Sequence, residues 1–151
     1  MTSKSFFIGL LAVFLSGCAG VKKDEPLPKG YSLASSNDSM DTYFVKPDSW
    51  FYKGNKNVRQ LEVVKALKKE DEVEGHKFIA IKTKYVFDCE NKNKYTKIPS
   101  GFFDNKYAIG KPVVPFPFSS SRWLFAKDGS SEGVMWDVLC VQLMAEVDAK
   151  S

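Results

Sequence analysis

Hydrophobic and polar side chains alternate most regularly between residues 78 and 89. Every second position as far as Cys89 is apolar, aromatic or threonine, whereas lysine and aspartate occupy positions between them. A period of two is typical of a β-strand that buries one face. The pattern therefore predicts a strand whose core-facing row ends at Cys89.

Shorter apolar runs, separated by clusters of turn residues, predict the other strands. These runs lie at residues 43–45, 50–52, 58–67, 95–98, 102–107 and 123–125. The charged run 68–74 is predicted to be a solvated hairpin loop. Strands that follow one another through short turns predict an antiparallel meander of about six strands, in an α+β fold.

The C-terminal part of the chain has the pattern of a helix. Residues 128–131 offer N-cap chemistry, and Glu132 stands in the first turn, where the helix dipole favours an acid. The helix is predicted to run to about Val147 and to pack on the sheet with Cys140 on its buried face. Its apolar stripe consists of Trp136, Cys140 and Leu143, with Val134, Val138 and Val141 close beside it.

Residues 110–121 combine prolines with apolar side chains. Proline cannot donate a hydrogen bond to a neighbouring strand, so the segment is predicted to be a loop or an irregular edge. Apolar side chains left exposed there would form a surface that binds a partner protein. The candidate partner-binding patch is Val113, Val114, Phe116 and Phe118. Most of the other aromatic residues are expected in the core.

The N-terminus reads as a bacterial export signal. Lys4 precedes an apolar run at residues 6–15, and small residues follow before Cys18. The run has about half of the roughly 20 apolar residues that a spanning helix needs. Residues 1–17 are therefore predicted to be a cleaved signal peptide.

The four residues from Leu15 to Cys18 resemble the bacterial lipobox, whose cysteine is acylated. The resemblance implies lipidation of Cys18 and anchoring on a membrane through its acyl chains, and two or more chains give stable anchoring. Ala19 follows where lipoproteins kept in the inner membrane usually have aspartate, which implies the outer membrane. The chain from 18 to 41 is rich in Gly, Ser, Pro and charge, so it is predicted to be a flexible lipidated tether to a domain at residues 42–151.

The number of cysteines leads to a second expectation, a disulfide bond. Acylation of Cys18 leaves Cys89 and Cys140, and an even pair in an exported protein predicts one disulfide between them. The alternative is a pair of buried free thiols.

Composition limits the classes of function. With 44% hydrophobic and 26% charged residues the chain has the composition of one globular domain. Its net charge of +4, or +3 once Lys4 is removed with the signal, is too mild to indicate nucleic-acid binding.

The sequence offers no catalytic set. His76 is the only histidine and has no zinc-ligand partners at the usual spacing, so it is expected at the surface. Asp88 and Glu90 flank Cys89 and are expected to be exposed charges rather than a catalytic pair. No phosphate-binding or dinucleotide-binding motif is present in the sequence. We therefore expect a protein that is not an enzyme and needs no metal or cofactor.

From residue 42 onward the sequence resembles the surface-adhesin protein E family of small Gram-negative lipoproteins. The residues that carry the likeness are Tyr43, Phe44, Val45, Pro47, Asp48, Ser49, Tyr85, Val86, Phe87, Asp88, Cys89, Phe102, Phe103, Asp104, Gly110, Trp123, Asp128, Gly129, Ser130 and Cys140. The resemblance implies an antiparallel sheet with a C-terminal helix disulfide-linked to it. It also implies surface display, homodimerisation and adhesion to host matrix or serum proteins.

The function expected from the sequence is that of an outer-membrane lipoprotein that binds a host or envelope protein without catalysis. The alternative is a periplasm-facing lipoprotein that inhibits an enzyme, as lysozyme-inhibitor lipoproteins do, or assists envelope assembly.

Overall fold

The structure is a computed structural model that describes residues 26–116 and 122–143. Its elements are β1 (Tyr31–Ser36), β2 (Met40–Val45), β3 (Phe51–Tyr52), β4 (Asn55–Val73), β5 (His76–Asp88), β6 (Lys94–Phe103), β7 (Val114–Pro115), β8 (Leu124–Phe125), α1 (Ser131–Asp137) and the π-helical η1 (Val138–Gln142). The predicted signal peptide, with Cys18 just after it, lies outside the described residues, as does the predicted helix end at Val147.

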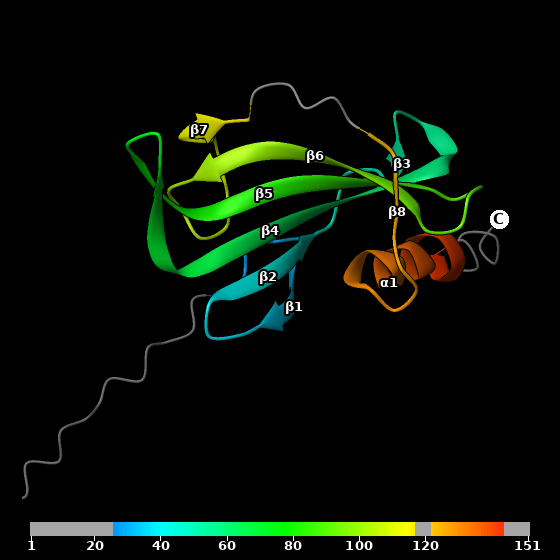
Figure 1. Cartoon of the computed structure of the whole chain (residues 1–151), viewed down its shortest axis with the longest axis horizontal. Helices are drawn as coiled ribbons and strands as arrows, with labels where there is room; N and C mark the ends of the chain where they lie inside the picture. Colours follow the sequence, from blue (N-terminus) through cyan, green and yellow to red (C-terminus); the bar gives the residue numbers. More distant parts are fainter. Residues whose placement is uncertain (1–25, 117–121, 144–151) are drawn as a thin grey trace, which may run out of the picture.

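The strands form one antiparallel sheet in the order β1-β2-β4-β5-β6-β7, with β3 paired to β4 and β8 paired to β6 (Figure 1). Neighbours in the sheet are thus mostly neighbours in sequence. The predicted α+β meander, with a C-terminal helix linked to the sheet, is confirmed.

The longest hairpin corrects one prediction. The charged run 68–74 is not a loop, because β4 continues through Val73 and only Glu74 and Gly75 make the turn, both with positive φ. This part of the hairpin extends beyond the covered body of the sheet, so its charged side chains stay solvated while the backbone remains paired. Lys77 and Glu70 form an ion pair across it at 2.9 Å.

The N-terminal boundary of the domain also differs from the prediction. Residues 31–41 are not part of a tether, since β1 pairs with β2 along its length. The polar sequence of β1 gives little strand signal because the strand lies at the sheet edge with most side chains exposed. Its position is fixed by backbone pairing and by the Tyr31 hydroxyl, which donates a hydrogen bond of 2.8 Å to the Tyr107 carbonyl.

The sheet carries a separate hydrophobic core on each face. On one face the helix covers a cluster around Phe87, and on the other face Tyr107 and Ala108 from the loop after β6 cover a cluster around Val64. Both Phe87 and Val64 are fully buried. On β5, the row of side chains predicted to face the core is therefore buried only where the helix covers it, at Tyr85 and Phe87. The opposite row of β5 is also buried, at Phe78, Ala80 and Val86.

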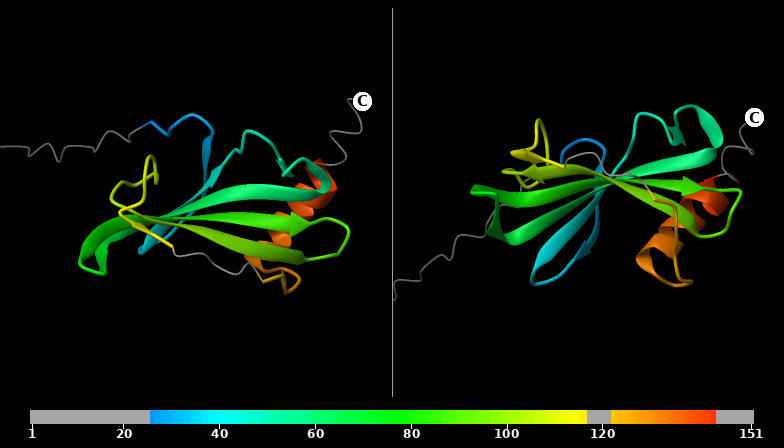
Figure 2. Two further views of the ribbon diagram at one scale, coloured as in Figure 1. Left: turned by 90° about the horizontal axis from the view of Figure 1, so that it is seen from above. Right: turned by 45° about the horizontal axis from the view of Figure 1, so that its top comes forward.

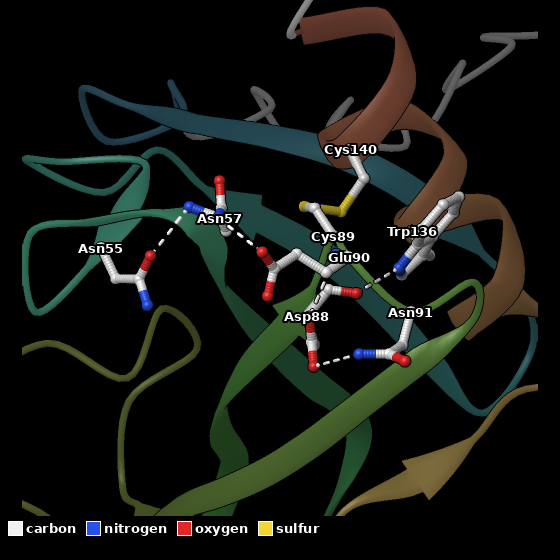
Figure 3. The surroundings of a disulfide bond; sticks show 8 residues. All are labelled: Asn55, Asn57, Asp88, Cys89, Glu90, Asn91, Trp136 and Cys140. Carbon is white, nitrogen blue, oxygen red and sulfur yellow. Dashed lines mark hydrogen bonds between the residues drawn. A yellow bond between two sulfur atoms is a disulfide. The ribbon is translucent and has the colours of Figure 1, made fainter.

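The helix begins as predicted and is held to the sheet at two points. The Ser130 hydroxyl accepts a hydrogen bond from the Gly133 amide as the N-cap, and Glu132 lies in the first turn. The predicted disulfide between Cys89 and Cys140 is confirmed, with 5.2 Å between the Cα atoms (Figure 3). The indole N–H of Trp136 donates to the Asp88 carbonyl at 2.9 Å (Figure 3). The helix therefore lies at the end of the sheet away from the β4–β5 turn (Figures 1 and 2).

A buried carboxylate joins the N-terminal hairpin to the rest of the sheet. Asp41 on β2 accepts hydrogen bonds from the Lys68 ammonium and the Ser36 hydroxyl, and Lys106 lies 3.7 Å away. The Lys68 bond, followed by the Ser36 bond, lowers the pKa of Asp41 to about 2. This carboxylate therefore stabilises the fold above its unfolded pKa, and the contribution is lost as the pH falls toward the folded value.

Candidate binding surface

The predicted partner-binding patch lies along the outer edge of β6. The Val113 amide donates to the Phe102 carbonyl at 2.8 Å, and Val114 pairs with the same residue as part of β7. Both valines are half-buried, whereas Phe116 keeps 36% of its surface exposed. Phe118 lies outside the described residues. The structure thus brings three of the four predicted residues together at one end of this edge.

Gly101 explains how a proline-rich segment can lie against a strand. Its φ is +149°, and a Cβ atom at this position would meet the Pro112 Cβ at 2.6 Å and the Val114 carbonyl at 2.7 Å. Only glycine permits so close an approach. Pro115 is tolerated because β7 is an edge strand, where the N–H group that proline lacks is not needed for a hydrogen bond to another strand. The Phe116 ring then rests on Phe102, with 4.8 Å between ring centroids.

A second group of exposed apolar side chains lies at the other end of β6. Trp123 is 41%, Leu124 39% and Phe125 70% exposed, although the last two form β8. Lys94 covers one face of the Trp123 ring, with its ammonium 5.0 Å from the centroid. The sequence predicted this strand but not its exposure.

We call the two groups together the β6 edge surface. It comprises Val113, Val114, Phe116, Trp123, Leu124 and Phe125, which belong to β7, to β8 or to residues next to them and flank β6. Exposed apolar side chains gathered on a protein surface are typical of interaction sites, and aromatic residues contribute most to binding in such sites. Each end of this edge therefore presents a candidate contact for an apolar partner.

The acidic pair beside the disulfide is structural. Asp88 was expected to be exposed, but only 9% of its surface is exposed. Its carboxylate accepts a hydrogen bond from Lys94. Figure 3 shows the bond that it accepts from Asn91 and the bond that the Asn57 side-chain amide donates to Glu90. Burial raises the pKa of Asp88, but the Lys94 bond and the others outweigh it, so the pKa is lowered overall. The pair therefore stabilises the turn after β5.

His76 is exposed at the start of β5, in line with the prediction. Within residues 26–116 and 122–143, no group of three or more His, Cys, Asp or Glu side chains is arranged to hold a metal ion. None of the helices in these ranges is long and apolar enough to cross a membrane.

The fold defines a small disulfide-bonded domain, an antiparallel sheet with a C-terminal helix linked to it. Within this class, the chain belongs to the family described as surface-adhesin protein E, whose model matches residues 31–141. The match confirms the resemblance seen in the sequence and begins at the first residue of β1. Searches of the curated proteins and of the solved structures found no match. The chain is therefore an adhesin-like surface protein.

Proposed function

We propose that this protein is a lipid-anchored, outer-membrane adhesin that binds a host extracellular-matrix or serum protein without catalysis. The observation that carries the proposal is membership of the adhesin family across the whole described sheet and most of the helix. That family also supports a binding role rather than an enzymatic one.

The anchor is proposed from the sequence. The residues from Leu15 to Cys18 resemble a lipobox, and acylation of Cys18 would hold the chain on the membrane. Because the Pro28 carbonyl accepts a hydrogen bond from the Tyr31 amide and the Gly30 carbonyl accepts one from the Lys46 amide, the tether proposed between lipid and domain comprises residues 19–27. A coil of this length spans roughly 15 to 18 Å, by about 5 to 6 Å times the square root of the residue number. The domain would thus stand clear of the lipid head groups.

The β6 edge surface is the proposed contact with the partner. Phe125 and Trp123 at one end and Phe116 at the other present large aromatic area that the fold itself leaves exposed. Lys92 and Lys94 add positive charge near β8, although each also pairs with an acid of the chain, Asp128 and Asp88. A partner with an apolar patch bordered by acidic groups would match this surface.

Binding of the purified protein to immobilised matrix and serum proteins tests the proposal. Replacing both Phe116 and Phe125 by serine is expected to weaken binding by about tenfold or more, because aromatic anchors dominate interface energies. Val141→Ser is the matched control, since Val141 is 55% exposed on the helix, away from β6. Unchanged binding by the double variant would reject the β6 edge surface. Absence of binding by the wild type to every such protein would reject the proposed partner class.

A further inference from the structure

The face of the sheet that carries the helix also contains an open groove of about 890 Å³. Its floor is formed by β2, β4 and β5, including Phe44 and Val63, and its walls are β1 on one side and α1 with η1 on the other. The β1–β2 hairpin and the helix are the neighbouring elements below β4 in Figure 1. The groove is separate from the β6 edge surface, which contributes none of its lining residues.

The groove exists because the helix covers only part of this face. The helix packs over the cluster at Tyr85 and Phe87, leaving the half of the sheet nearer to β1 uncovered. Apart from Tyr31, the β1 residues that line the groove are small, namely Ser32, Ala34 and Ser35, and they do not fill the space. The sequence pattern did not predict the groove, because the small polar residues of this edge strand resemble those of a flexible tether.

The lining is mainly apolar. Phe44, Trp50, Val63, Val138 and Leu143 are among the side chains that contribute. Val138 remains 39% exposed although the sequence placed it beside the buried stripe of the helix. A half-open apolar cavity of this size is within the range of sites that bind small organic ligands.

Charged side chains in the lining indicate the polarity of the ligand. Lys46, at the end of β2, lines the groove, and no ion pair engages Lys46 within the described residues. Lys65 on β4 also lines the groove. It pairs with Thr42, which lies four residues before Lys46 in the chain. The acid that lines the groove, Glu132, is held by Lys97 at 2.9 Å. Lys65 likewise has no ion pair within the described residues, so the charge of the groove favours an anion, and Lys46 is the ammonium chosen for substitution.

We propose that this groove binds a single-chain anionic amphiphile of the fatty-acid type, with the alkyl chain between β1 and the helix and the carboxylate at Lys46. The apolar lining accounts for the chain, and the unpaired ammonium accounts for the head group. The proposal does not depend on which protein the β6 edge surface binds.

Titration of the full mature chain with palmitate tests this site, with Cys18→Ser introduced so that no acyl chain is attached. Saturable binding at one site is expected. Shortening the ligand to myristate and then laurate should weaken binding, by up to about fourfold for each methylene removed. Hexadecyltrimethylammonium, which has a long alkyl chain but a positive head group, should bind at least tenfold more weakly than palmitate.

Two matched pairs of variants locate the site. Val138→Glu places a carboxylate inside the groove and is expected to weaken palmitate binding at least tenfold, whereas Val141→Glu, on the same helix but outside the lining, should leave it unchanged. Lys46→Glu should weaken binding several-fold, and the exposed Lys56→Glu should not. Circular dichroism and thermal unfolding of each variant confirm that it is folded.

Absence of palmitate binding by the folded protein would overturn the proposal. Equal binding by the Val138→Glu and Val141→Glu variants would also overturn it, because the ligand would then lie elsewhere. If palmitate does not bind but Val138→Glu dissociates a dimer, the groove is an interface between two copies of this chain and the proposal fails.

Discussion

Replacing Cys89 and Cys140 together by alanine is expected to lower the free energy of unfolding by about 4 kcal/mol. The two residues are separated by 51 positions, so the bridge closes a long loop and restricts the unfolded chain. It also holds the helix to the end of β5, beside the hydrogen bond from Trp136 to Asp88. Such a loss is a large share of the stability of a domain this small.

Urea unfolding followed by tryptophan fluorescence measures this effect. Wild-type protein treated with a reductant should unfold at nearly the same urea concentration as the double variant, because both lack only the bridge. A loss below about 1 kcal/mol would contradict the argument that the disulfide holds the helix on the sheet.

Phe87→Ala is expected to destabilise the domain by about 3 to 5 kcal/mol. Phe87 is fully buried under the helix, and its ring lies near those of Tyr85 and Tyr95, with centroids 6.2 and 6.1 Å away. Removing the ring leaves a cavity in a core shared by the central strands and the helix, and the disulfide limits how far the helix can move to fill it.

Phe125→Ala serves as the control, because it also removes a phenylalanine ring but does so from the exposed strand β8. Because Phe125 is 70% exposed, its replacement should change the free energy of unfolding by less than about 0.5 kcal/mol. Chemical denaturation of both variants gives the comparison. Similar losses in the two proteins would show that the core on the helix face is not organised around Phe87.

Local patterns in the sequence were sufficient to predict much of the fold. The alternation that ends at Cys89 predicted the central strand, and the cap at Ser130 with Glu132 after it predicted the start of the helix. The pairing of Cys89 with Cys140 followed from cysteine counting alone. Each of these signals arises from residues close together in the chain or from the chemistry of cysteine, so it can be recognised in a single sequence.

Features that depend on coverage by distant segments were not visible in the sequence. Asp88 was expected to be exposed, but Lys94 and Asn91 from the following turn and strand fold onto its carboxylate. Further along β5, the loop that carries Tyr107 and Ala108 gives the sheet a second core that buries Ala80, so alternation no longer separates buried from exposed positions. The strand β1 lacked an apolar pattern because it is an exposed edge, and only pairing with β2 orders it.

The same limit applies to the candidate surface. Prolines around Val113 and Phe116 correctly indicated an edge segment, because proline acts on its own backbone. The exposure of Phe125 could not be predicted, since β8 reads as an ordinary apolar strand until its place at the sheet edge is known. The groove between β1 and the helix likewise depends on how far the helix extends over the sheet.

Protease treatment of intact cells that carry the full chain tests surface display most directly. The domain is expected to be digested without permeabilising the cells, while a periplasmic control protein survives. Digestion only after permeabilisation would contradict surface display and would favour the periplasm-facing alternative, an enzyme inhibitor or an assembly factor.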